Sequence, residues 1–152
     1  MPLAAPDPAA LAQYRGMTWV ESRVMQAWIV AHWQEWDTID FNVRLGDGVT
    51  LGEEFDPATR RAAQLLSQKR ADAIAQRADQ VLLIEVKVRV NPSSLGQLLT
   101  YRDLFVQQYG VLRPVRMLAI GRQVVPDFEL TLRAAGVEVE LYPRVADEVL
   151  AL

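Results

Sequence analysis

The sequence predicts an α/β fold formed by one domain. Three observations lead to this prediction. Apolar residues between positions 17 and 31 recur with helical spacing, residues 81–84 are apolar on both faces like a central strand, and helix-like and strand-like patterns alternate after residue 91. The length of 152 residues suits a single core, and 51% hydrophobic with 23% charged residues is ordinary for a soluble globular domain.

The N-terminal part predicts a flexible arm followed by a helix. Residues 1–12 are rich in proline and alanine and are expected to form the arm, and residues 13–152 are expected to form the domain. Thr18 is a suitable N-cap, and Glu21 follows three residues later, as in a capping box. Four tryptophans lie in or just after this helix, and we expect them to anchor the core or an interface.

The remaining elements are predicted from apolar periodicity and from the proline, glycine and capping residues at their ends. They are, in order, a hairpin over residues 40–51, a helix from Asp56 to about Gln68, two strands over 72–76 and 81–88, a helix from Asn91 to near Gly110, a strand over 115–120, a helix over 127–135, a strand over 137–142 and a short helical tail over 144–152. No internal repeat or low-complexity tract interrupts this order.

The composition excludes several kinds of site. With no cysteine and one histidine, the chain cannot form disulfides, thiolate metal sites or a histidine-rich zinc site within one chain. A bound metal would be held mainly by oxygen, which points to Mg²⁺ or Mn²⁺. The net charge of −3 argues against a broadly basic nucleic-acid binder, although it permits a small basic strip beside an acidic site.

The sequence shows no sign of export or of membrane insertion. The N-terminus lacks a basic start followed by an apolar run, so it does not resemble a signal peptide. No stretch approaches the roughly 18 apolar residues that a membrane span needs. We therefore expect a cytoplasmic protein with no membrane partner.

Two acids and a lysine are expected at one end of the hairpin formed by the two central strands. A turn centred on residues 77–80 pairs residues whose numbers sum to 157, so Asp72 faces Glu85. Opposed side chains lie about 5 Å apart, where like charges are destabilising, and a divalent cation between them would remove that repulsion. Lys87 lies two residues beyond Glu85 and projects from the same face. It is one of only two lysines in a chain with 16 basic residues.

Each of these signals has an ordinary explanation when it is taken alone. Glu85 and Lys87 could form an ion pair at the end of a surface strand, and Asp72 could be a turn or capping residue. Gln97 and Tyr101 lie four apart and share one face of the next helix, as many residue pairs do. Their combination in this order on these elements is the specific signal.

Together, these residues resemble the motif of the PD-(D/E)XK nuclease superfamily, and more narrowly its RecB-type branch. The matching positions are Asp72, Glu85-Val86-Lys87 and Gln97-Leu98-Leu99-Thr100-Tyr101. The resemblance covers about residues 17–142 by element order. It implies a restriction-endonuclease-like αβββαβ core with a mixed central sheet flanked by helices. The proline of the superfamily name is absent, because Ala71 precedes Asp72.

The resemblance also implies a metal-dependent deoxyribonuclease. Asp72 and Glu85 would hold one or two Mg²⁺ or Mn²⁺ ions, with the Val86 carbonyl as a further ligand. Lys87 would orient the attacking water or stabilise charge in the transition state. Glu21 has two interpretations: it closes the capping box of its helix, or it binds the metal through water and tunes Lys87.

Gln97 would help to position the nucleophile or the lysine, and Tyr101 would contact the nucleic-acid backbone. The further basic residues expected to touch phosphates flank the motif: they are Lys69, Arg70, Arg89 and Arg102.

Three functions remain open at this point. The first is a nuclease acting on DNA in a structure- or end-directed way, in a DNA-processing context such as that of a phage or mobile element. The second is an inactive nuclease-fold DNA-binding module, and the third is an assembly subunit. The small size and low basicity suggest a homodimer or a subunit of a larger complex that supplies further DNA contacts.

Overall fold

A five-stranded mixed sheet forms the centre of the computed structural model, which describes residues 3–147. The strand order is β1-β2-β3-β5-β7, and the strands are β1 (Thr38–Leu45), β2 (Lys69–Arg77), β3 (Gln80–Val86), β5 (Val115–Gly121) and β7 (Val137–Leu141). The first three strands pair antiparallel, and β3, β5 and β7 pair parallel. The shorter strands β4 (Arg89–Val90) and β6 (Gln123–Val124) form a separate parallel pair.

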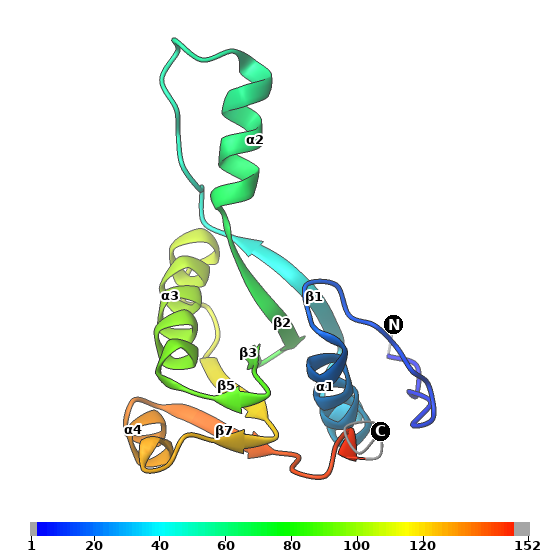
Figure 1. Cartoon of the computed structure of the whole chain (residues 1–152). Coiled ribbons are helices and arrows are strands. Elements are labelled where there is room, and N and C mark those ends of the chain that lie inside the picture. The colour runs from blue at the N-terminus through cyan, green and yellow to red at the C-terminus, as the bar shows by residue number, and fades with distance from the viewer. Residues whose placement is uncertain (1–2, 148–152) are drawn as a thin grey trace.

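Helices cover both faces of this sheet (Figure 1). They are α1 (Trp19–His32), α2 (Pro57–Ser67), α3 (Pro92–Tyr109) and α4 (Phe128–Ala134), with a 3₁₀ turn η1 (Trp33–Glu35) after α1. One core cluster joins the sheet to α3 and α4, and the other joins it to α1. The order α1, β1, β2, β3, α3, β5 confirms the predicted αβββαβ core and the restriction-endonuclease-like α/β fold.

The sequence signals at the helix ends are confirmed. Thr18 and Glu21 form the capping box of α1, with both reciprocal hydrogen bonds present. Asn91 caps α3 through its side chain, and Gly110 follows that helix with a φ of 78°, a conformation that favours glycine. Of the tryptophans, Trp28 and Trp36 are buried in the α1 core cluster, whereas Trp19 is 37% exposed.

The predicted hairpin over residues 40–51 is wrong. Strand β1 forms, but its partner is β2, with Thr38 opposite Gln76 and Leu45 opposite Lys69. Residues 46–56 form an irregular loop instead of a returning strand. Local turn residues favoured a hairpin, whereas β2 offers β1 a long antiparallel partner and a place in the central sheet.

Helix α2 and the loop before it form an arm that stands away from the sheet (Figure 1). The helix contains no buried residue, and it belongs to neither core cluster. The Ser67 hydroxyl accepts a hydrogen bond from the Val49 amide, and the Gln68 side chain donates to the Gly46 carbonyl. These two bonds tie the loop to the end of α2 nearest the sheet.

The N-terminal segment lies along α1. Arg23 donates hydrogen bonds to the carbonyls of Ala10 and Ala12, and Gln26 donates to the carbonyl of Asp7. At the other end, residues 143–146 form turns, and the rest of the predicted C-terminal helix lies largely outside the described residues. Within residues 3–147, no helix has the length and apolarity needed to cross a membrane.

Candidate active site

At Asp72, strand β2 pairs with neither of its neighbouring strands, β1 and β3. Against β3, the observed pairs have numbers that sum to 157, as predicted, but the last one is Ala73 with Ile84. Against β1, pairing is continuous except at one position, where Asn42 would face Asp72. Asp72 therefore lies at a break in both ladders, which gives its carboxylate room to turn.

A backbone kink at Asn42 accompanies this break. Asn42 has a φ of 52°, and asparagine is among the few residues that adopt this left-handed region readily. The two sides of the kink face different helices: Phe41 packs with the α1 cluster and Val43 with the α3 cluster. In β2 the same change places Ala71 in the α3 cluster and Ala73 in the α1 cluster, although a regular strand would put both alanines on one face.

The carboxylates of Asp72 and Glu85 form the centre of the site. Asp72 Oδ2 accepts a hydrogen bond from the backbone amide of Val86 at 2.8 Å, where a regular ladder would place a main-chain carbonyl. The side chain of Glu85 is only 2% exposed, and its Oε1 lies 3.5 Å from Lys87 Nζ. Its other oxygen, Oε2, is buried and has no hydrogen-bond partner. One lysine thus lies beside a buried acid, Glu85, and a half-buried one, Asp72.

Burial raises the pKa of both acids, and the charge of Asp72 adds to the shift at Glu85. For Glu85, burial is the larger cause and the charge of Asp72 the second, and together they raise its pKa to about 8 although Lys87 opposes them. The pKa of Asp72 is also raised, again mainly by burial, and the Val86 amide opposes that shift. Near neutral pH this pair therefore resists carrying two negative charges without a cation.

Gln97 and Tyr101 bring α3 over the acids, as predicted from their spacing. Tyr101 is buried, and burial followed by the charges of Glu85 and Asp72 raises the pKa of its hydroxyl above the usual range. Tyr101 therefore stays a neutral hydrogen-bond donor. The side-chain oxygen of Gln97 is buried and has no hydrogen-bond partner. Both residues line a cavity of about 380 Å³ on the surface of α3.

Glu21 serves the structure as the capping residue of α1, which was one of its two interpretations. Its Oε1 accepts a hydrogen bond from the Thr18 amide at 3.1 Å. Its charge nevertheless contributes to raising the pKa of Asp72, so it lies within electrostatic reach of the acid pair. Within residues 3–147, no three histidine, aspartate or glutamate side chains gather into a ready metal-binding cluster.

The donor set of Asp72 and Glu85 nevertheless fits a hard divalent cation. Mg²⁺ prefers oxygen ligands and is commonly bound by one or two carboxylates, with water and substrate phosphates completing its coordination. The unpartnered Glu85 Oε2 is a ligand of this kind, and a cation beside it would relieve the repulsion between the acids. Two protein carboxylates are therefore a sufficient starting set.

The basic residues predicted to touch nucleic acid lie in different places around the site. Lys69 lines the cavity beside Gln97, and Arg70 lies two residues before Asp72 in β2. Arg89 is exposed in β4, just before α3 begins. Arg102 is partly exposed, and its guanidinium lies 3.3 Å from the carboxylate of Asp103, which weakens its availability for a phosphate.

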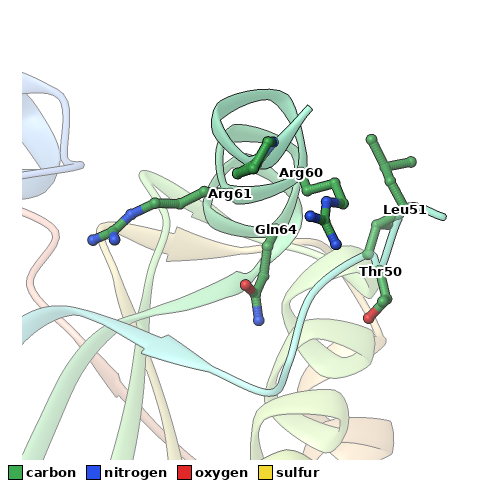
Figure 2. Close-up of a pocket in the computed structure, with 7 residues that line it drawn as sticks. Thr50, Leu51, Arg60, Arg61 and Gln64 are labelled. Atoms are coloured by element: carbon green, nitrogen blue, oxygen red, sulfur yellow. The ribbon is translucent and has the colours of Figure 1, made fainter. Parts of the chain in front are cut away.

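A second hollow, of about 300 Å³, lies on the α2 arm away from the acid pair. Figure 2 shows Arg60 on the side of α2 that faces Thr50 and Leu51, whereas Arg61 points to the opposite side. The Nε of Arg60 is buried without a hydrogen-bond partner. This hollow contains no acid or nucleophile, so it cannot carry out the chemistry of the central site.

Sequence reasoning missed Asn42. Its position inside an alternating strand pattern gave no sign of a kink, because the left-handed backbone is set by tertiary packing. Gly16 lies against it: a Cβ on Gly16 would come within 2.7 Å of Asn42 Oδ1. The only available signal was the residue type, since asparagine tolerates a positive φ better than most residues.

Comparisons with known proteins give no family and three distant structural likenesses. No family model and no curated protein matches the chain. A repair endonuclease from Pyrococcus abyssi is 20% identical, with 48% of this chain and 32% of that chain covered and a TM-score of 0.42. The structure of a complex of EndoMS with double-stranded DNA is 15% identical, covers 91% of this chain and 48% of that chain, and has a TM-score of 0.47.

A protein of unknown function is 13% identical, with 86% of this chain and 64% of that chain covered and a TM-score of 0.44. The chain therefore spans about one third to two thirds of the length of these proteins.

Proposed function

We propose that this protein is a metal-dependent nuclease that hydrolyses phosphodiester bonds in DNA, of the PD-(D/E)XK type and its RecB-type branch. One observation carries the proposal. The buried Glu85 leaves a carboxylate oxygen without a partner beside a second acid, with Lys87 Nζ 3.5 Å from its other oxygen. Buried carboxylate oxygens are normally hydrogen-bonded, and within residues 3–147 Glu85 Oε2 is the one buried carboxylate oxygen without a partner.

Asp72 and Glu85 would hold Mg²⁺ or Mn²⁺, with the Val86 carbonyl as the further ligand that the motif implies. Bound there, the cation supplies Lewis-acid polarisation of a phosphate and a lowered pKa for a water molecule. The Val86 amide fixes the Asp72 carboxylate through a 2.8 Å hydrogen bond. This bond holds the Asp72 carboxylate in one orientation and reduces the reorganisation that metal binding requires.

Lys87 is the cation of this chain nearest the acids. Its side chain is 32% exposed, so the ammonium can meet both the acid pair and a substrate at the surface. It would orient the attacking water and stabilise negative charge that develops on the phosphate oxygens. Gln97 would accept a hydrogen bond from that water or from Lys87, and the neutral Tyr101 hydroxyl would donate to a phosphate oxygen.

The strongest competing function is that of an inactive nuclease-fold module that binds DNA or serves assembly. Such a module has no use for a buried carboxylate beside a half-buried one, because their repulsion destabilises the fold. Replacing either acid with an apolar residue would remove that destabilisation. The presence of both Asp72 and Glu85 therefore favours a catalytic function over a purely binding one.

The deciding experiment incubates the protein with supercoiled, linear and single-stranded DNA in Mg²⁺, Mn²⁺ or EDTA. We expect cleavage with either metal, none with EDTA, and a loss of at least about 100-fold in Lys87→Ala. The matched control is Lys69→Ala, which removes the only other lysine and should retain cleavage chemistry with weaker binding. Cleavage that survives loss of both Glu85 and Lys87 would refute the proposal.

A homodimer or a larger complex remains part of the proposal. Exposed apolar side chains such as Phe55 (43%) and Leu66 (80%) on the α2 arm are available for a partner. Light scattering of the purified protein tests this point: a mass near 17.1 kDa at all concentrations would show a monomer.

A further inference from the structure

Gly96 is an exposed residue in the second turn of α3, at a position where the fold does not require glycine. Its backbone has no positive φ, and a Cβ built on it would meet no atom within 4 Å. Glycine is the least favourable residue other than proline in a helix interior, and alanine would fit there. Neither backbone geometry nor packing within the described residues explains why a side chain is missing.

The surroundings of Gly96 are suited to an anion. The cavity of about 380 Å³ over this position is lined by Lys69, Ser93, Gly96, Gln97, Thr100 and Tyr101. These residues offer one ammonium, three hydroxyls and one side-chain amide, and none of them is acidic. Position 96 is also the fifth residue of α3, close to the positive end of the helix dipole.

Tyr101 connects this cavity with the acid pair. It lines the cavity, and the charges of Glu85 and Asp72 act on its hydroxyl, so it lies within electrostatic reach of both acids. Gln97 also lines the cavity, and its buried side-chain oxygen has no hydrogen-bond partner. A ligand bound over Gly96 would therefore lie beside Tyr101, a neighbour of the acids.

We infer that Gly96 is the close-approach point for the phosphodiester backbone of the substrate strand beside the cleaved bond. The missing side chain lets the sugar–phosphate chain lie against α3, with Lys69 and the Ser93 hydroxyl beside a phosphate. Thr100 Oγ1 already donates its proton to the Gly96 carbonyl at 2.8 Å, so the Ser93 hydroxyl is the one available to donate to a phosphate oxygen. This inference rests on the proposed nuclease function and adds the position of the bound strand.

The test measures DNA binding and thermal stability of Gly96→Ala and Gly96→Leu. Binding of a fluorescein-labelled oligonucleotide is followed by anisotropy in Ca²⁺, which should support binding with little cleavage. The matched control is Gln107→Leu, which adds the same side chain to an exposed position three turns further along the same face of α3. A second oligonucleotide carries uncharged methylphosphonates in place of phosphates next to the cleaved bond.

In Gly96→Ala, thermal stability should rise while DNA affinity falls. Gly96→Ala should raise Tm by about 2–4 °C because alanine favours the helix. It should also weaken binding about threefold, and Gly96→Leu should weaken it at least about tenfold. Gln107→Leu should bind like the wild type. The methylphosphonate oligonucleotide should bind the wild type more weakly than the unmodified oligonucleotide does. Gly96→Leu should add little to that loss of affinity, because both changes remove the same contact between α3 and the phosphate.

The outcomes separate this inference from the proposed function. Unchanged DNA affinity in Gly96→Leu, or equal losses in Gly96→Leu and Gln107→Leu, would overturn the inference, while Mg²⁺-dependent cleavage would still stand on its own. A wild type that does not bind DNA would also overturn it. Gly96-dependent binding in a protein that cleaves no DNA would uphold the inference and refute the nuclease. If a protein or free nucleotide occupied the cavity instead, the methylphosphonates would have no effect, which again overturns it.

Discussion

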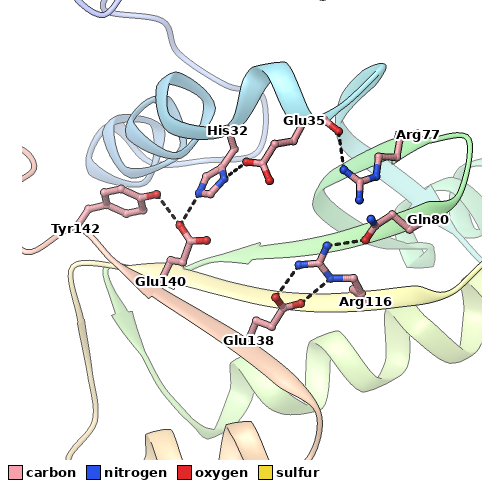
Figure 3. Close-up of polar contacts among 8 residues, drawn as sticks. All are labelled: His32, Glu35, Arg77, Gln80, Arg116, Glu138, Glu140 and Tyr142. Atoms are coloured by element: carbon pink, nitrogen blue, oxygen red, sulfur yellow. Dashed lines mark hydrogen bonds and ion pairs between the residues drawn. The ribbon is translucent and has the colours of Figure 1, made fainter.

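Two groups of carboxylates lie on opposite faces of the same sheet, and their surroundings differ. On the face covered by α1, Glu138 receives two hydrogen bonds from Arg116 at 2.9 and 2.6 Å, and Glu140 receives one from Tyr142 at 2.8 Å (Figure 3). These acids are 38–46% exposed. Near the end of β3, Glu85 is 2% exposed and keeps one oxygen without any partner.

The difference shows that this fold can satisfy its acids when their task is structural. Arg116 also donates to Gln80, so the acid network ties the first residue of β3 to β5 and β7 (Figure 3). The Asp72–Glu85 pair has one hydrogen bond from the backbone, that of the Val86 amide to Asp72, and burial raises the pKa of both acids. An unsatisfied buried acid is a feature that stability alone would remove, so its presence points to a ligand.

The largest expected effect comes from neutralising one acid in each group. Glu85→Gln should lower metal-dependent DNA cleavage by at least about 100-fold, because it removes the unpartnered carboxylate that the cation needs. Glu138→Gln makes the same chemical change in the satisfied network and should keep cleavage within about twofold. Initial rates on one DNA substrate measure both. Equal losses in the two variants would show that the acid pair has no special part in catalysis.

The second largest expected effect is the change that Glu85 causes in the free energy of unfolding as pH rises. The folded protein keeps the Glu85 proton up to a pKa of about 8, whereas the ordinary value is 4.5. The folded state therefore binds more protons between these values, so the free energy of unfolding should fall as pH rises from about 4.5 to about 8. The loss should be on the order of a few kcal/mol, since one pKa unit corresponds to roughly 1.4 kcal/mol.

Mg²⁺ should recover that loss, because a cation replaces the proton between the acids. Urea unfolding at pH 5.5 and pH 8 with Mg²⁺ or EDTA measures it: the stabilisation by Mg²⁺ should be larger at pH 8. Glu85→Gln should remove most of the pH dependence in this range and abolish the response to Mg²⁺. A wild type whose stability rises with pH across this interval would contradict the assigned pKa of Glu85.

A smaller effect on DNA cleavage is expected from substitutions at Asn42, the kinked residue of β1 opposite Asp72. Asn42→Gly keeps access to the positive φ, so it should retain cleavage within a few-fold. Asn42→Val should disfavour this backbone, since β-branched residues rarely adopt it, and should lower cleavage by about tenfold or more. The readout that separates positioning from stability is the Mg²⁺ concentration needed for half-maximal rate. It should rise in Asn42→Val and stay near the wild-type value in Asn42→Gly.

The sequence predicted the parts of this site that follow from periodicity. Strand and helix spacing correctly placed Asp72 near Glu85, Lys87 on the same face, and Gln97 with Tyr101 above them. It could not predict the break in both ladders at Asp72, because the left-handed backbone of Asn42 is selected by packing against Gly16 from a distant segment. The prediction of a hairpin over residues 40–51 is wrong for a similar reason. Strand β1 pairs with β2, which is distant in sequence, and local turn residues do not reveal this pairing.

The smallest expected effect lies in the satisfied network and concerns His32. Its ring nitrogens face Glu35 and Glu140, and both can be donors only when the ring is protonated. Burial lowers the pKa of His32, but the hydrogen bonds and charges of these two acids outweigh it, and the net pKa is raised. Stability from this group is therefore present at low pH and is lost as pH rises above the ordinary value of 6.5.

His32→Gln should remove this contribution, which we expect to be below about 1 kcal/mol because the side chains of Glu35 and Glu140 are 52% and 38% exposed. Urea unfolding between pH 6 and pH 9 measures it. His32 and Glu85 both make the free energy of unfolding fall as pH rises, so only the response to metal separates their contributions. Mg²⁺ should restore the stability lost through Glu85 and leave the part lost through His32 unchanged. If Mg²⁺ restored the His32 part as well, the two carboxylate groups would be coupled, and their contrast would no longer identify Asp72 and Glu85 as the site.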